Sequence, residues 1–451
     1  MPLGRAGATA AGGCVSCGIG RVLAPADWRR ARRECRKFVY NTDRMLRFLT
    51  AGESHGPALV VILDGVPSGL AIDFDAIAVE MRRRQGGYGR GRRMQIENDA
   101  AEALSGIRAG RTTGGPVSLL IRNRAWENWQ QTMHTGPEPP AGAPGAPRRP
   151  VTRPRPGHAD LAGGLKYDHA DLRDVIERAS ARETAARVAA GAIARQLLAA
   201  VGVEIASHVI AIGDLAIENP AQVSFAEARA IPETSPLRCV DTALEARMVE
   251  AIDRAREAGD TLGGAFEVIA HDVPAGLGTY VQWDRRLDGR LAQAFMSIPA
   301  IKAVGIGLGP VLAALPGSRA HDELLPAPAS TGQVPGLARP TNRAGGLEGG
   351  VTNGEDVRVV AYMKPLSTLM KPLASVDLET MAAAEAAIER SDVCAVPAAA
   401  VVGEAVMSLA LADALLEKFG GDTIADLRQN LRGWNERLRA RLTRTASPSG
   451  A

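Results

Sequence analysis

The chain of 451 residues has few cysteines, few aromatic side chains and few lysines. Its five cysteines are an odd number without regular spacing, which argues against the disulfide framework of a small secreted protein. Cys14 and Cys17 form one CxxC pair, but a zinc site needs a second ligand pair and only Cys35 lies nearby, so we expect no metal. Aromatic residues make up 4% of the chain, which leaves few stacking platforms for nucleic acid.

Long apolar runs and targeting signals are also absent from the sequence. No run reaches the ~18–20 apolar residues that a membrane-spanning helix requires, and residues 1–20 lack the apolar centre of a signal peptide. The formal net charge is only +3, so the chain is not a generally basic, nucleic-acid-binding protein. Neither GxGxxG after a first strand nor GxxxxGK[ST] occurs. These absences favour a cytoplasmic protein and argue against a membrane or a nucleic acid as its partner.

The composition divides the chain into three parts. Residues 1–44 are rich in small residues and then basic, so they are either a disordered or mis-annotated extension before a start at Met45, or an organelle-targeting peptide. A protein that begins at Met45 is expected to keep full activity. Residues 45–420 form the expected catalytic domain, and its Pro/Gly-rich loop at 134–156 is a candidate active-site lid. Residues 421–451 are expected to form an amphipathic helix and a tail.

The hydrophobic pattern predicts an α+β protein rather than a doubly wound sheet, because strands and helices mix without a βαβ rhythm. Strand-like segments contain Phe48, the alternating Leu59, Val61 and Leu63, and the runs VEIASHVIAIG and AFEVIAHDV. Helices are expected over 73–84 (with Asp73 as the cap), 172–200, 244–258, 378–390, 398–418 and 422–443.

Three residues that can transfer protons stand on turns flanked by Gly, Pro or Ser. They are His55 in GESHG, His158 in RPGHAD and Asp392 in RSDVCAVP. Catalytic groups commonly lie on such loops, and histidine is the natural acid or base near neutral pH. A single histidine on a turn is more often a surface or capping residue, and that is the reading for the other five: His134, His169, His208, His271 and His321.

Two arginine-rich segments are suited to anions. The loop RRRQGGYGRGRR at 82–93 combines guanidinium groups, which bind phosphate and carboxylate, with glycines that let a ligand approach the backbone. The alternative is a solvated or RNA-binding Arg-Gly segment. In the helix ERASARETAAR, Arg178 and Arg182 are four residues apart and can share one face, unless Glu177 and Glu183 pair with them.

A glycine-rich segment at 345–354 precedes a strand and the sequence KPLST at 364–368. Its glycines permit close contact with a planar ring or a phosphate, and Lys364, Ser367 and Thr368 supply donors. The alternative is a glycine-rich hairpin followed by a loop.

Taken together, these segments resemble the chorismate synthase family. The matching segments are GESHGPAL at 52–59, QGGYGRGRRMQIEND at 85–99, SGIRAGRTTGGP at 105–116, RPGHADLAG at 155–163, ERASARETAAR at 177–187, SIPAIKAVGIGLG at 297–309, GSRAHDE at 317–323, GGLEGGVTNG at 345–354, KPLSTL at 364–369 and RSDVCAVPAA at 390–399. They occur in the family's order and cover essentially all of 45–420.

The resemblance implies the fold and the reaction. Members convert 5-enolpyruvylshikimate 3-phosphate to chorismate and phosphate by a 1,4-anti-elimination, the last common step toward the aromatic amino acids. They are carbon–oxygen lyases that need reduced FMN without net redox change, and NADPH is a candidate indirect reductant. The family fold is a helical core between antiparallel sheets, usually as a homotetramer. An ordinary flavin oxidoreductase is the rival enzyme class.

The resemblance also implies roles for individual residues. His158 would assist the leaving phosphate as an acid, His55 would keep the flavin in its working protonation state, and Asp392 would help to remove the ring proton with the flavin. The implied FMN contacts are Arg178, Ala179, Ser180, Pro299, Ala300, Gly349, Lys364, Pro365, Leu366, Ser367, Thr368 and Arg390. The implied contacts to substrate or NADP are Arg84, Arg90 and Arg182. Pro299 departs from the family's usual Asn or Gln, and proline has no backbone N–H to donate.

Overall fold

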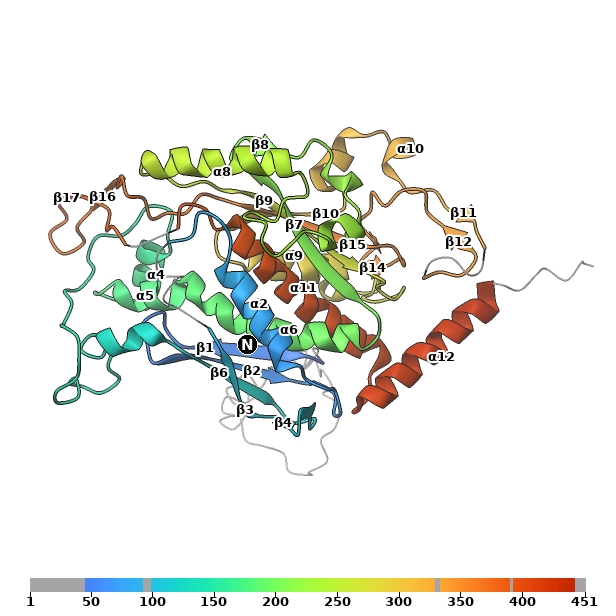
Figure 1. The fold of residues 1–451 in the computed structure, drawn as a ribbon, viewed down its shortest axis with the longest axis horizontal. Coiled ribbons are helices and arrows are strands. Elements are labelled where there is room, and N and C mark those ends of the chain that lie inside the picture. Colours follow the sequence, from blue (N-terminus) through green and yellow to red (C-terminus); the bar gives the residue numbers. More distant parts are fainter. Residues whose placement is uncertain (1–44, 92–98, 329–332, 390–391, 443–451) are drawn as a thin grey trace, which may run out of the picture. The chain divides into compact units, whose positions relative to one another are not determined.

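The computed structural model describes residues 45–91, 99–328, 333–389 and 392–442. Two antiparallel sheets organise these residues (Figure 1). The first sheet has the order β1 (Arg47–Ala51), β2 (Ala58–Asp64), β6 (Val117–Arg122) and β3 (Ala101–Ser105). The second sheet has the order β10 (Ile301–Ile306), β15 (Val357–Met363), β9 (Gly264–His271), β7 (Glu204–Ile212) and β8 (Leu215–Ala216). The predicted extension at 1–44 lies outside the described residues.

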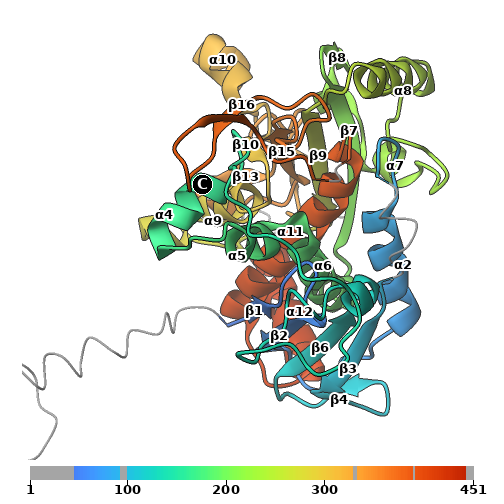
Figure 2. The same ribbon diagram turned by 90° about the vertical axis from the view of Figure 1, so that its left-hand side faces the viewer.

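Four helices lie between the two sheets, as Figures 1 and 2 show from two sides. They are α2 (Phe74–Gln85), α6 (Thr184–Ala199), α9 (Leu287–Met296) and α11 (Val396–Phe419). Helix α6 packs on β2 and β6 of the first sheet, while α11 packs on β7 and β9 of the second. The α+β fold with a helical core between antiparallel sheets is therefore confirmed.

The sequence pattern explains why these layers form. In β2, Leu59, Val61 and Leu63 are buried while Ile62 on the other face is exposed, which is the alternation of a half-covered strand. Helix α6 is rich in alanine and buried along most of its length. A Cβ atom at Gly191 would lie 2.4 Å from the Cβ of Ala405, so glycine is what permits the close contact between α6 and α11.

Helix α11 is long and apolar enough to cross a bilayer, but 94% of its most apolar window is buried inside the protein. It also carries Glu404 at its centre, which is 1% exposed. Arg83 donates to Glu404 at 2.7 and 2.8 Å, Arg195 at 2.5 Å, and the hydroxyl of Ser207 at 2.6 Å. Burial raises the pKa of Glu404, but the arginines outweigh burial and hold it well below its usual range. This carboxylate therefore joins α2, α6, β7 and α11.

The remaining elements surround this frame. The helices are α4 (Asp160–Tyr167), α5 (Arg173–Ala179), α7 (Phe225–Arg229), α8 (Thr242–Glu257), α10 (Gly317–Ala320) and α12 (Ile424–Leu442). Short 3-10 helices are η1 (Arg124–Asn128), η2 (Ala181–Glu183), η3 (Pro220–Gln222), η4 (Trp283–Arg285) and η5 (Gly309–Ala314). Two-stranded pairs join β4 (Ile107–Arg108) to β5 (Arg111–Thr112), β11 (Leu325–Pro326) to β12 (Leu337–Ala338), β13 (Leu347–Glu348) to β14 (Val351–Thr352), and β16 (Ala374–Val376) to β17 (Ala383–Glu385).

Most of the predicted helices are present, and α2 begins as expected. The side chain of Asp73 accepts from the backbone N–H groups of Asp75 and Ala76. The prediction of one helix over 172–200 is wrong. Helix α5 ends at Ala179, Ser180 is extended with φ −62° and ψ 140°, and its hydroxyl accepts from the N–H of Arg182 before α6 begins. A serine that caps the next turn breaks the helix here.

The predicted helix over 378–390 is also wrong. Residues 374–385 form the β16–β17 hairpin, with Met381 at φ 57° in its turn. The segment is rich in alanine, but it is tied to the long loop, since the N–H of Leu378 donates to the carbonyl of Thr152 at 3.0 Å and Ser375 donates to that of Pro154 at 2.6 Å. These tertiary contacts override the helix propensity of the sequence.

Candidate active site

Three arginines and two aspartates from separate segments form one charged cluster. Arg84, in the last turn of α2, is 3% exposed and donates to Thr184 at 2.9 Å and to the carbonyl of Ala181 at 3.0 Å. Burial lowers the pKa of Arg84 to about 10, although the nearby charge of Asp99 raises it. Arg84 therefore remains a cation at neutral pH.

The other members of the cluster lie around Arg84. Arg182 on η2 donates to Asp99 at 2.6 Å, and Arg84 approaches the same oxygen at 3.4 Å. Arg90, in the Gly/Arg loop, donates to Asp392 at 2.6 Å. The charges of Arg182, Arg90 and Asp392 also shift the pKa of Arg84, so these groups lie close enough to interact electrostatically. We call Arg84, Arg90, Arg182, Asp99 and Asp392 the arginine cluster.

Gly89 fixes the position of Arg90 within this cluster. Its backbone has φ 90°, and a Cβ atom there would lie 3.0 Å from the Cβ of Cys394 and 3.1 Å from its nitrogen. The N–H of Val393 donates to the carbonyl of Gly89 at 2.8 Å, and that of Gly91 donates to Asp392 at 2.7 Å. The loop therefore lies against the segment that carries Asp392, which only glycine permits here.

His55 lies in the turn between β1 and β2, and groups from two other segments hold it. Its Nδ1 is 2.9 and 3.0 Å from the two carboxylate oxygens of Glu177, and its backbone N–H donates to Glu177 at 2.8 Å. The imidazole stacks on Trp129 with ring centroids 3.8 Å apart. The guanidinium carbon of Arg148, from the Pro/Gly-rich loop, lies 3.8 Å from the centroid of Trp129. This loop therefore contacts the aromatic ring that supports His55.

The turn of His55 is linked to the arginine cluster through Asn123. The amide of Asn123 donates to the carbonyls of Glu53 and Gly56 at 3.0 and 2.8 Å. Its oxygen accepts from Arg182 at 3.0 Å. A single buried asparagine thus connects the GESHG turn to a cation of the cluster.

His158 lies just before α4 and is paired in a similar way. Its Nδ1 hydrogen-bonds to Asp160, which is fully buried. Arg155 donates to Asp160 at 2.8 Å, lies 3.1 Å from Nδ1 of His158, and donates to Thr368 at 2.9 Å. Burial raises the pKa of Asp160, but hydrogen bonds from His158 and Arg155 outweigh it and hold the pKa well below its usual range.

The KPLST segment lies beside His158. The backbone N–H of Lys364 donates to the carbonyl of Ala300, and its Nζ donates to that of Gly157, both at 2.9 Å. Burial lowers the pKa of Lys364, and the charge of Lys302 adds to this effect. The carbonyl of Leu366 accepts from Thr261 at 2.8 Å. Pro365 and Ser367 lie in close contact with two glycines of neighbouring segments. A Cβ atom at Gly263 would lie 2.8 Å from the nitrogen of Pro365, and one at Gly157 would lie 3.6 Å from the Cβ of Ser367.

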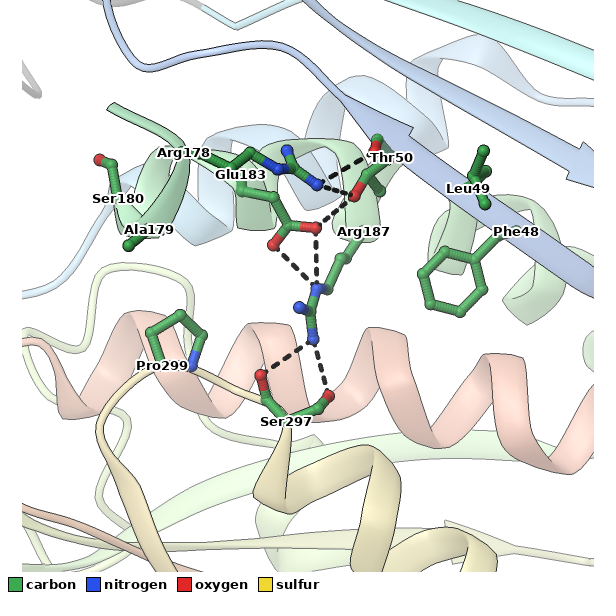
Figure 3. Close-up of a pocket in the computed structure, with 10 residues that line it drawn as sticks. All are labelled: Phe48, Leu49, Thr50, Arg178, Ala179, Ser180, Glu183, Arg187, Ser297 and Pro299. Atoms are coloured by element: carbon green, nitrogen blue, oxygen red, sulfur yellow. Dashed lines mark hydrogen bonds and ion pairs between the residues drawn. The ribbon is translucent and has the colours of Figure 1, made fainter. Parts of the chain in front are cut away.

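Four of the predicted FMN contacts line one cavity of about 520 Å³, namely Arg178, Ala179, Ser180 and Pro299 (Figure 3). The other lining residues are Phe48, Leu49, Thr50, Glu183, Arg187 and Ser297. A chain of polar contacts crosses it: Arg178 donates to Thr50 at 3.0 Å, Thr50 to Glu183 at 2.7 Å, and Arg187 donates both to Glu183 at 2.9 Å and to Ser297 at 2.7 Å.

Arg178 and Arg182 do not share one helical face, so that prediction is wrong. Because the chain is extended at Ser180, Arg178 turns to the carbonyls of Thr50 and Gly52 while Arg182 turns to Asp99. The two glutamates do not pair with these arginines either. Glu177 bonds to His55, and Glu183 bonds to Arg187.

One predicted residue, Gly349, does not join these groups. Gly349 lies in the β13–β14 hairpin, where Leu287 at the start of α9 donates to the carbonyl of Gly350. Ser297 and Pro299 follow the opposite end of α9. This helix has 10 residues and spans roughly 15 Å, and its length separates Gly349 from them. Arg390 lies outside the described residues.

Sequence reasoning missed the residues that hold the predicted ones: Trp129, Glu177, Asp160, Asn123 and Asp99. Asp160 stands two residues after His158, and this spacing was the one available indication. Trp129 and Glu177 are 74 and 122 positions from His55 in the sequence, so only the fold brings them to it.

Comparison with known proteins points in one direction. Residues 46–416 match the family model described as chorismate synthase. The chain is 57% identical over 396 residues to a protein named chorismate synthase from Desulforudis audaxviator, covering 88% of this chain and 99% of that protein. It is 57% identical over 394 residues to the protein of that name from Moorella thermoacetica, covering 87% and 99%. A solved structure titled "Crystal Structure of Chorismate Synthase" matches with a TM-score of 0.69 at 40% identity, covering 88% and 98%.

Proposed function

Since the chain belongs to the chorismate synthase family of lyases, we propose that it eliminates phosphate from 5-enolpyruvylshikimate 3-phosphate to give chorismate, with reduced FMN as cofactor. In this proposal the reaction is a 1,4-anti-elimination and supplies the last common intermediate of the aromatic amino acids. The enzyme works in the cytoplasm as a homotetramer.

The observation that carries the proposal is the arginine cluster. Its three guanidinium groups come from α2, the Gly/Arg loop and η2, and they meet two carboxylates. The proposed substrate carries a phosphate and two carboxylates, and guanidinium forks bind both kinds of group. The cations are already held in place by the fold, so little side-chain entropy is lost when an anion binds.

The residues around the cavity fit a flavin. A volume of about 520 Å³ lies within the usual range for small-molecule sites, and its lining combines apolar Phe48 and Leu49 with polar groups. Ala300, beside it, has φ 68°, and a non-glycine residue held in this region often marks a functional site. Arg178, Ala179, Ser180, Pro299 and the KPLST segment would hold the cofactor. When bound, reduced FMN would supply electron density to the allylic system of the substrate.

The protein's own groups would bind, orient and move protons. His158, held by Asp160, would donate a proton to the departing phosphate. Asp392 is a candidate proton acceptor, and Arg90 donates a hydrogen bond to it in the free protein. Binding of a substrate anion by Arg90 would compete with that pair. His55 would keep the cofactor in its working protonation state.

Anaerobic turnover with photoreduced FMN tests the proposal. We expect equal amounts of chorismate and phosphate to form while the reduced flavin is not consumed. Oxidation of one flavin per product would instead indicate an ordinary flavin oxidoreductase. Turnover in air with oxidised FMN and NADPH, compared with the same mixture plus an outside flavin reductase, tests whether the enzyme reduces its own cofactor.

A further inference from the structure

Both predicted catalytic histidines are bonded through the same ring nitrogen to a carboxylate that the fold buries. Nδ1 of His55 contacts Glu177, whose side chain is 1% exposed, and Nδ1 of His158 contacts Asp160, whose side chain is 0% exposed. The imidazole rings themselves are 19% and 21% exposed. In each pair the carboxylate lies inside the protein and the ring reaches the surface of the site.

Glu177 fixes both the ring and the backbone of His55. One of its oxygens accepts from the backbone N–H of His55 at 2.8 Å, and both oxygens lie within 3.0 Å of Nδ1. The carbonyl of Glu177 accepts from the N–H of Ser54 at 3.0 Å. Trp129 stacks against the ring at 3.8 Å, which sets its plane. The turn cannot rotate Nδ1 away without breaking several of these contacts.

Asp160 is held as firmly, but by an arginine. Arg155 donates to it from its backbone N–H at 3.0 Å, from Nε at 2.8 Å and from Nη2 at 3.1 Å. Thr368 accepts from the same guanidinium group at 2.9 Å. Asp160 is also the first residue of α4, where the helix dipole favours a negative charge.

We propose that Glu177 and Asp160 are positioning residues, which keep a proton on Nδ1 of His55 and His158 and thereby make Nε2 the working nitrogen of each histidine. The inference rests on the proposed function for its catalytic part. A carboxylate at one imidazole nitrogen selects the tautomer and stabilises the imidazolium ion. For His158 this keeps a proton available at Nε2 for the leaving phosphate.

Other charges face the two rings. Arg155 and the Nζ of Lys364, which donates to the carbonyl of Gly157, lie beside His158. Arg173 lies 3.8 Å from Glu177, and Arg148 covers the ring of Trp129. Removing either carboxylate leaves these cations in place, so the histidine beside it should lose its proton more easily.

The test uses Asp160→Asn and Glu177→Gln, with Asp356→Asn as the matched control. Nδ1 of His271 lies 2.6 Å from Asp356, and its ring stacks on Phe225, so the control removes a carboxylate from a similar pair elsewhere. We expect kcat to fall ~10–10²-fold in the first two variants with little change in KM, as for other groups that orient a functional histidine. The alkaline limb of kcat in Asp160→Asn should move to lower pH by about 1 unit or more. The control should match the wild type.

A drop in kcat with an unmoved pH profile, or values within ~2-fold of wild type, would overturn the inference. Nitrogen-15 NMR of the wild-type imidazoles tests it without any turnover. At high pH the neutral rings of His55 and His158 should carry their proton on Nδ1, and a majority of the Nε2–H tautomer would equally refute it. If the wild type makes no chorismate, the proposed function fails, but the NMR result still decides the role of the two carboxylates.

Discussion

At the scale of single residues, Gly89 has a strict steric requirement. Its positive φ is unfavourable for other residues, and a Cβ atom would meet Cys394 at 3.0 Å. The carbonyl of Gly89 accepts a hydrogen bond from the N–H of Val393, and Gly89 precedes Arg90 in the chain. A shift of the backbone at Gly89 therefore changes the distance between Arg90 and Asp392. A steric change of one methyl group should therefore be felt in substrate binding.

Gly89→Ala is expected to weaken substrate binding at least ~10-fold, since it displaces one guanidinium fork of the arginine cluster. Gly110→Ala is the matched control, because Gly110 also has a positive φ (71°) but nothing lies within 4 Å of its Cβ position. The control should lose about 1 kcal/mol of stability and keep normal binding. Equal effects in both variants, by titration and thermal melts, would refute the steric account.

The buried thiols give a second prediction at this scale. Burial raises the pKa of Cys394 and of Cys239 to about 11. The reactive thiolate is therefore a small fraction at pH 8. We expect iodoacetamide to leave both unmodified in the native protein and to label both in guanidinium chloride, as measured by peptide mass mapping. Rapid labelling of Cys394 in the native protein would contradict this burial.

At the scale of elements, the loop at 134–156 is anchored by a few contacts. Arg148 covers Trp129, Gln131 donates to the carbonyl of Ala143 at 2.5 Å, and a Cβ at Gly145 would lie 2.6 Å from the carbonyl of Asn128. Residues 134–150 of the loop are exposed or half-buried, so this part of it adds little to the buried core. Through Arg148, this part of the loop contacts Trp129, which stacks on His55.

Deletion of 136–149 should leave the melting temperature within a few degrees of wild type and lower turnover, because Trp129 loses the cover of Arg148. Arg148→Ala should reproduce part of the loss. Limited proteolysis of the intact protein should cut this loop first, and FMN with substrate should slow the cut. Cleavage at an unchanged rate would remove the idea that the loop is a lid.

Elements were predictable from the sequence where local pattern and burial agree, as in α2, α8, α11 and the strand around Leu59. They were not predictable at Ser180 and at 374–385, where a serine cap and contacts with the long loop decide the conformation. The site follows the same division. His55 and His158 were recognisable from their turns, whereas Trp129 and Glu177 reach His55 only through the fold.

At the scale of the whole molecule, the helical layer depends on one buried charge. Glu404 of α11 is surrounded by Arg83, Arg195 and Arg238 from other segments. Glu404→Gln removes the anion that all three cations share, while Arg83 and Arg195 keep Glu80, and breaking a buried pair typically costs ~3–5 kcal/mol. Urea unfolding should show a loss of this size.

Glu417→Gln, on the same helix, is the matched control, because Glu417 is 29% exposed in its pair with Arg290 and such pairs contribute ~0–1 kcal/mol. The pKa of Glu404 lies below its unfolded value, so its contribution is full above that value and is lost as pH falls through the lower, folded pKa. Similar losses in both variants would contradict the role of Glu404.

The measurement that tests the central claim most directly separates rate from binding in five variants of the assembled site. His55→Ala, His158→Ala and Asp392→Asn should lower single-turnover phosphate release by ~10²–10⁴, the usual size of an acid–base contribution, with little change in substrate affinity. Arg90→Ala should mainly weaken the binding of substrate, and Arg178→Ala that of FMN, through the loss of charge-assisted contacts. If both histidine variants release phosphate at near-normal rates and only lose stability, the histidines are structural and the account of the active site is wrong.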